Sequence, residues 1–231
     1  MIQGRGEFIR LLLEDLDLSY MDVARLPESE GGGVPALQRR MTETPLAFAP
    51  PLLESGTSTI SQTFQICSFL AKRHGRLPRG EQSEARAHHL ALTVYDFVVE
   101  AHNVHHPLGP MLYYEDQRAE AKRAARAFID HRIPKFLGFF EGCITANAAT
   151  APWLLGPELC YADLWLFQAL EGLHYSFPQT FSRCMQGYPL LTTLRDSVRR
   201  RPRLASYLES ERRIPFNEQG LFRHYPELDL G

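Results

Sequence analysis

The sequence APPLLESG at residues 49–56, followed six residues later by Gln62-Thr63, decides the fold of the first part of the chain. The surrounding apolar segment, residues 46–54, is short and contains two consecutive prolines, which predicts a strand and not a helix. The residues Ser-Gly-Thr-Ser at 55–58 predict a tight hairpin turn. Apolar side chains then recur at helical spacing over residues 61–74, so a helix is expected to begin near Gln62.

The residues before this stretch predict one helix, one strand and a long loop. Apolar side chains recur every three or four positions over residues 7–16, which indicates a helix. Residues 18–23 alternate between apolar and polar side chains, as a short strand does. Three consecutive glycines within residues 27–45 indicate a loop with room for one helical turn. The first 75 residues are therefore expected to run helix, strand, loop, strand, hairpin, helix.

The rest of the chain has the helical period throughout. A segment rich in Gly, Pro and Arg at residues 75–80 indicates a linker. We expect a first domain at residues 1–75, a linker at 76–82 and an all-helical domain at 83–231. The segment 163–173 is apolar nearly all the way round the helix, so it is expected at the centre of its domain.

Composition excludes several classes of protein. The 231 residues include 25 basic and 27 acidic side chains mixed along the chain, so neither nucleic acid nor a membrane is expected as a partner. The basic run at residues 199–203 is expected to be a solvated helix end. Four widely spaced cysteines form no CxxC pair and are expected to be reduced. Residues 1–10 lack the apolar core of a signal peptide, so the predicted location is the cytoplasm.

In this order and spacing, the proline pair, the hairpin and the Gln-Thr pair resemble the cytosolic glutathione transferase superfamily. In that family a strand enters through a cis-proline, turns at a polar hairpin containing glycine, and reaches a Gln-Ser pair at a helix start. The resemblance implies a thioredoxin-like α/β domain followed by an all-α helical-bundle domain with an electrophile pocket. It also implies glutathione as co-substrate and a homodimer.

The same resemblance assigns glutathione-binding residues. Pro50, Pro51 and Leu52 would present strand-edge backbone groups to the cysteinyl part of glutathione. Gln62 and Thr63 would hold the γ-glutamyl carboxylate, because a helix N-terminus offers amide donors to an anion. Pro50 departs from the family pattern, since proline has no backbone N–H to donate. If Pro51 is the cis residue, losing that hydrogen bond costs about 1 kcal/mol.

Two further segments carry the resemblance. Residues 154–164 are similar to the glycine turn that leads into the capped central helix of the family. Asp163 is expected at the third helical position, bonding back to the cap backbone, whereas Cys160 replaces the usual Ser or Thr and should leave the cap half complete. Residues 4–10 are similar to the Gly, Arg, Glu turn that opens the first helix in alpha-like and sigma-like members.

The group that would ionise the glutathione thiol is the weakest part of the match. In relatives with this turn, the preceding strand supplies a tyrosine, and here Met1 stands where that strand would be ending. Arg5 matches an arginine near the thiolate in alpha-like members, and a cation there would lower the thiol pKa. Alternatively, Arg5 caps a turn or pairs with a carboxylate. Weak conjugating activity is therefore expected.

Polar residues near position 100 form two further constellations. His89, Thr93, Asp96 and Glu100 share one helix face, and the resemblance makes Asp96 the candidate to reach across a dimer to the glutathione amino group. Solvation or local salt bridges are the other interpretation of this face. The cluster at residues 102–106 contains three histidines but fits no metal-binding motif, so no metal is expected.

The aromatic and basic C-terminal tail, residues 212–226, is too apolar for a disordered end. It could cover the electrophile pocket or simply pack on the helical domain. Tyr113 and Tyr114 are further candidates to line that pocket.

Two functions remain open after this reading. The first is a detoxifying transferase that joins the glutathione thiolate to small apolar electrophiles. The alternative is a non-catalytic or weakly active glutathione-binding or interaction protein with the same fold.

Overall fold

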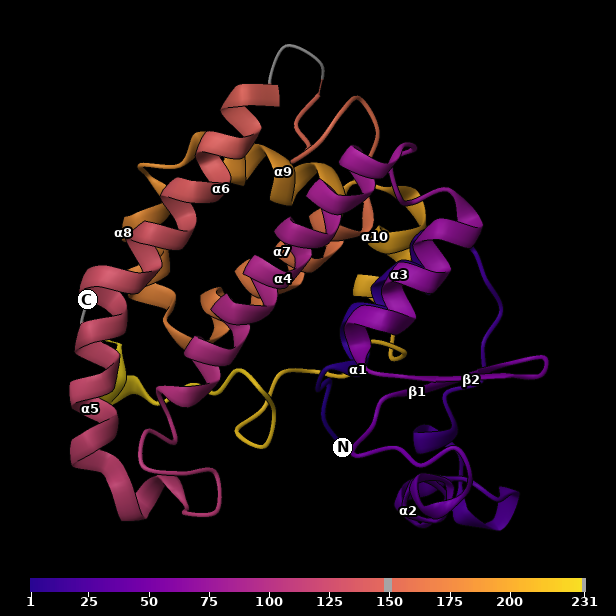
Figure 1. The fold of residues 1–231 in the computed structure, drawn as a ribbon. Coiled ribbons are helices and arrows are strands. Elements are labelled where there is room, and N and C mark those ends of the chain that lie inside the picture. The colour runs from indigo at the N-terminus through magenta and orange to yellow at the C-terminus, as the bar shows by residue number, and fades with distance from the viewer. Residues whose placement is uncertain (148–150, 230–231) are drawn as a thin grey trace.

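The N-terminal part of the chain surrounds one small sheet with helices (Figure 1). The computed structural model describes residues 1–147 and 151–229. In Figure 1 α3 lies on one side of the β1–β2 hairpin and α2 on the other. The elements of this part are α1 (Gly6–Asp15), α2 (Gly33–Thr42), β1 (Leu52–Ser55), β2 (Ser58–Ser61) and α3 (Thr63–His74).

The remainder of the described chain is helical, and its residues between positions 86 and 200 contain no strand. Short 3-10 turns at Tyr114–Gln117 and Pro226–Leu228 supplement the helices. The helices are α4 (Glu81–Asn103), α5 (Arg118–Ala127), α6 (Ile133–Asn147), α7 (Tyr161–Ser176), α8 (Pro178–Met185), α9 (Pro189–Arg199) and α10 (Pro202–Leu208).

Helix α7 forms the centre of the helical part, as its all-round apolar sequence predicts. Nearly all of its residues are buried, and it packs against α1, α4, α8 and α9. Its N-terminal cap is more complete than expected. The Asp163 carboxylate accepts hydrogen bonds from the backbone N–H groups of Cys160 and Leu154, each at 2.8 Å, and the Cys160 sulfur accepts from the Asp163 N–H. The prediction of a half-complete cap was wrong, because a thiol also accepts a hydrogen bond.

Three predictions for the first domain need correction. Residues 18–22 form no strand and lead into the short 3-10 turn Val23–Arg25. The loop expected over residues 27–45 contains the ten-residue helix α2. The strand expected over residues 46–54 is limited to Leu52–Ser55, because the preceding prolines break it.

A π-helical turn, Phe128–Arg132, joins α5 to α6. Pro134 follows this turn as the second residue of α6. Proline offers no N–H for the normal α-helical bond, and here the Ile133 N–H bonds to the Phe128 carbonyl five residues back.

Ion pairs join the two parts of the chain around Asp15, whose side chain is buried at the end of α1. Its carboxylate accepts from Arg76 at 2.6 Å and also from Arg201. Within the helical part, Arg199 pairs with Glu171 of α7. The basic run at 199–203 is therefore not simply a solvated helix end, as the sequence suggested, because two of its members bind carboxylates of other helices.

Candidate glutathione and electrophile sites

The β1–β2 ladder brings the two sequence motifs of the first domain together. Leu52 pairs with Ser61 in an antiparallel register, so Pro51 and Gln62 lie beside one another at the same end of the hairpin. The Pro50–Pro51 peptide bond is cis, as the resemblance implies, and so is the Thr44–Pro45 bond, which the sequence did not suggest. Residues 50–52 and 62–63 therefore form one continuous edge.

Gln62 and Thr63 open α3 with different exposure. Gln62 is exposed and has a backbone φ of 70°. Residues other than glycine rarely adopt this left-handed conformation, and it is often found at functional sites. The Thr63 hydroxyl is buried and has no hydrogen-bond partner among the described residues. In this conformation the Gln62 side chain and the first backbone N–H groups of α3 are the donors available to a carboxylate.

Arg5 lies exposed at the N-cap of α1, and its guanidinium stands 5.4 Å from the centre of the Tyr95 ring of α4. Neither of the two structural interpretations from the sequence describes it, because within the described ranges Arg5 forms no ion pair and no side-chain cap bond. A cation over an aromatic face remains open to solvent and to an anionic ligand.

Asp96 differs from its three neighbours on the polar face of α4. Glu100 forms a two-point ion pair with Arg132, His89 contacts Arg86, and the Thr93 hydroxyl donates to the His89 carbonyl. Asp96 is exposed and forms no ion pair or hydrogen bond with any part of the chain that the structure describes. It is therefore the carboxylate of this face that remains available to a ligand or a second subunit.

A buried ionic network lies directly beneath the turn that carries Arg5. The Glu7 carboxylate is fully buried and accepts from Arg213 at 2.7 Å, Tyr207 at 2.9 Å and Arg10 at 3.3 Å. Burial raises the pKa of Glu7, and the two arginines oppose that rise by stabilising the charged form. The sequence marked Glu7 only as part of a family turn; its partners lie up to 206 positions away and left no local signal.

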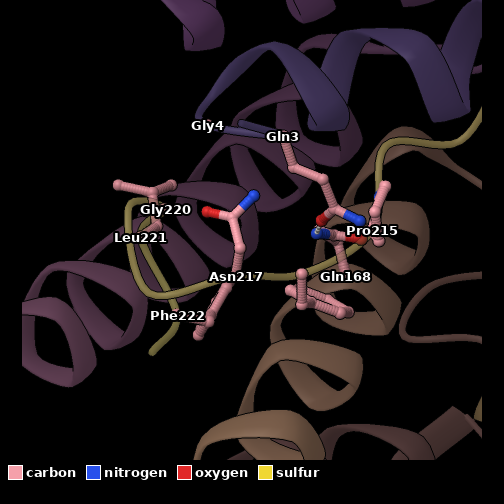
Figure 2. A pocket seen from close by; sticks show the side chains of 9 residues that line it. Gln3, Gly4, Gln168, Pro215, Asn217, Gly220, Leu221 and Phe222 are labelled. Atoms are coloured by element: carbon pink, nitrogen blue, oxygen red, sulfur yellow. Dashed lines mark hydrogen bonds between the residues drawn. The ribbon is translucent and has the colours of Figure 1, made fainter. Parts of the chain in front are cut away.

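In the structure the C-terminal tail extends over residues 211–229, slightly longer than the segment 212–226 expected from the sequence, and it passes beside this turn (Figure 2). Gln3 and Gln168 point toward one another there and are joined by a 2.7 Å hydrogen bond, while Gln3 also donates to the Ile214 carbonyl at 2.6 Å. Farther along, the ring of Phe222 occupies the place that a side chain on Gly172 would need. The tail is thus packed against α1 and α7.

The tail also forms one wall of a cavity of about 600 Å³, here called the tail cavity. The opposite wall is the segment after α4, which includes both Tyr113 and Tyr114. Tyr114 stacks on Tyr225 of the tail with ring centres 3.7 Å apart. The two sequence candidates for an electrophile pocket, the tail and the tyrosine pair, therefore line the same cavity.

The histidine cluster lies next to the tail cavity but does not resemble a metal centre. His106 lines the cavity, whereas His105 is buried between Phe177 and Tyr225 with both ring nitrogens unpartnered among the described residues. Burial lowers the pKa of His105 to about 3 and that of His102 to about 4, so both rings are neutral near pH 7. Residues 1–147 and 151–229 contain no group of three or more potential metal ligands.

Comparison with known proteins agrees with this fold. Residues 102–211 match the family described as Glutathione S-transferase, C-terminal domain. Glutathione S-transferase P 1 of Xenopus laevis is 26% identical over 213 residues, which cover 92% of this chain and 90% of the relative. S-crystallin 4 of Enteroctopus dofleini is 21% identical over 93% of this chain and 95% of its own length.

Solved structures give the same result. The Pi-class glutathione S-transferase of Onchocerca volvulus superposes with a TM-score of 0.71 at 22% identity, covering 90% of this chain and 88% of that structure. At this identity the match establishes the fold. The family match over residues 102–211 and the whole-length relatives agree with it, so the chain is similar to the glutathione transferase superfamily. Within the described residues, no helix is long and apolar enough to span a membrane.

Proposed function

We propose that this protein is a glutathione transferase that binds glutathione along the edge formed by residues 50–52 and 62–63. The observation that carries the proposal is the ladder register that sets Pro51 beside Gln62 at the start of α3. A strand edge suits the peptide part of glutathione, and a helix N-terminus suits its γ-glutamyl carboxylate. Relatives named glutathione S-transferase match over nearly the whole chain, which supports this assignment.

In this proposal Arg5 stabilises the thiolate. A free thiol is only a few per cent ionised at neutral pH, so the reaction needs a positive charge or a donor at the sulfur. Arg5 offers an exposed guanidinium at the start of α1, where the helix N-terminus adds its own positive potential. The thiolate then attacks a small electrophile bound in the tail cavity, with detoxification in the cytoplasm as the proposed role.

The proposed enzyme is a homodimer in which Asp96 contributes to the glutathione site of the second subunit. The exposed and unpaired state of Asp96 supports this arrangement, because the other polar residues on its face are already bonded within the chain. An ammonium group such as the glutathione amino terminus would be its natural partner.

Binding to immobilised glutathione tests the site directly. The double variant Gln62→Ala with Thr63→Ala should bind at least about tenfold more weakly, a loss of about 1.4 kcal/mol, because it removes polar groups at the carboxylate end. Gln65→Ala, on an exposed position of the same helix, is the matched control and should bind normally. Unchanged retention of the double variant on the resin would reject the assignment.

The alternative is a glutathione-binding protein with little or no turnover. Pro50 supports it, because this residue lacks the backbone N–H that would bond to the cysteinyl unit. The S-crystallin relatives match over the same share of the chain as the transferases. Normal glutathione binding without conjugation of an aryl halide, between about pH 6 and about pH 9, would favour this alternative.

A further inference from the structure

We propose that the tail cavity selects aromatic electrophiles that carry an anionic group, and that the guanidinium of Arg223 binds this anion. The inference rests on the proposed function, because it specifies the second substrate of the same transferase. It is carried by the lining of the cavity and by the orientation of Arg223 within it.

The walls of the tail cavity favour a flat, unsaturated ligand. Its volume of about 600 Å³ lies within the usual range for small-molecule sites, about 300 to 1,000 Å³. Tyr114 is buried and stacks on Tyr225, so the exposed ring of Tyr113 and the partly exposed ring of Tyr225 are the aromatic surfaces that this lining offers to a ligand. Aromatic faces of this kind pack well against another ring.

Arg223 supplies an oriented cation to this cavity. Its Nε atom donates to the Gly220 carbonyl at 3.0 Å, which fixes the guanidinium within the turn of the tail. No carboxylate in the described part of the chain forms an ion pair with it. The remaining guanidinium nitrogens are therefore available, and their planar arrangement matches the two oxygens of a carboxylate.

Three histidines lie near this side of the cavity, and burial is the main cause that lowers their pKa values. The charge of Arg223 contributes, after burial, to lowering the pKa of His102, His105 and His106. Arg5 acts on His102 in the same direction, and no carboxylate is among the causes acting on these three rings. An anion placed beside Arg223 would thus meet neutral imidazoles and two arginine charges.

Two carboxylates also line the tail cavity, and both lie at its exposed rim. Glu115 and Glu218 are open to solvent, and Glu218 accepts only a long 3.5 Å hydrogen bond from Tyr175. Water and salt screen exposed charges more effectively than partly buried ones. A ligand is therefore expected to direct its anionic group toward half-buried Arg223 and its ring toward the tyrosines.

Equilibrium binding of two unreactive ligands tests this inference without requiring turnover. We would titrate the full chain with 3,5-dinitrobenzoate and with 3,5-dinitrobenzamide, which share a ring but differ in charge, using calorimetry. The benzoate should bind about tenfold more tightly, equivalent to about 1.4 kcal/mol. Arg223→Gln should abolish this preference and leave binding of the neutral amide within about twofold. Higher salt should also reduce the preference.

Arg183→Gln, on the exposed end of α8, serves as the matched control because it removes one positive charge outside the cavity. It should retain the preference. The inference is overturned if the unsubstituted chain binds both ligands equally or binds neither, or if the preference persists in Arg223→Gln. Because neither ligand reacts, an absence of conjugating activity, which would refute the proposed function, leaves this measurement unaffected.

Discussion

The packing of Phe222 against Gly172 provides the sharpest test of how the C-terminal tail is attached. A Cβ added to Gly172 would come closer than 3.0 Å to three ring carbons of Phe222. Carbon atoms pack at about 3.5 to 4.0 Å, so Gly172→Ala must push the ring away or distort α7. Phe222 is almost fully buried, and burial of such a ring stabilises a protein by about 1.5–3 kcal/mol.

Two opposing effects determine how much Gly172→Ala changes the free energy of unfolding. Alanine in a helix interior is favoured over glycine by about 0.5–1 kcal/mol, whereas overpacking a buried site costs about 1–3 kcal/mol. Gly172→Ala should therefore lower the free energy of unfolding by about 1–2 kcal/mol in the natural chain. With Phe222→Ala present the clash is absent, and the same substitution should raise the free energy by about 0.5–1 kcal/mol.

The assay is urea denaturation of the four proteins of this double-mutant cycle, followed by the fluorescence of the buried Trp165. We expect a coupling energy of about 1.5–3 kcal/mol between the two positions, within the range measured for residues in contact. If Gly172→Ala has the same effect whether or not Phe222 is present, the ring does not occupy this place and the tail is attached differently.

Three further predictions follow from individual side chains. Arg5→Ala should raise the pKa of bound glutathione, seen as a lower ultraviolet absorbance of the thiolate at neutral pH; equal absorbance would remove Arg5 from the site. Phe48, which is 99% exposed, should lie in a dimer interface, so Phe48→Ser should halve the mass measured by light scattering. His105→Phe should reduce the loss of stability between pH 7 and about pH 5.5 by about 1.3 kcal/mol, because burial keeps His105 neutral while the unfolded chain takes up a proton below about pH 6.5. Identical pH profiles of the two proteins would contradict this.

Sequence patterns predicted the elements whose side chains repeat with a clear period. The helix around residues 163–173 is confirmed, because an all-round apolar surface fits only a central position. Residues 18–23 misled because their polar side chains bond back to α1: Tyr20 donates to Glu14, and Asp22 accepts from Arg10. The alternation of these residues therefore reflects contacts with the neighbouring helix α1 and not pairing in a sheet.

Helix α2 was missed for a different reason. Its N-terminal turn contains Gly33 and Pro35, residues that usually indicate loops. Proline is nevertheless tolerated in the first turn of a helix, where its missing N–H would have had no partner. The residues proposed to bind glutathione, at 50–52 and 62–63, were accessible to sequence reasoning, because each set lies in a short contiguous motif. The Arg223 site was not, since the cavity depends on two segments that are about a hundred residues apart.

The attachments of the tail determine what kind of cavity it can form. Arg213 binds buried Glu7 at one end, Phe222 packs at Gly172 in the middle, and Asp229 accepts two backbone N–H groups at the start of α8 near the other end. A segment held at three points loses little further freedom when a ligand arrives. Ordering of a flexible loop would otherwise subtract from the affinity. The wall that carries Arg223 is therefore already formed, and selectivity in the tail cavity should arise from its charge and shape and not from closure around the ligand.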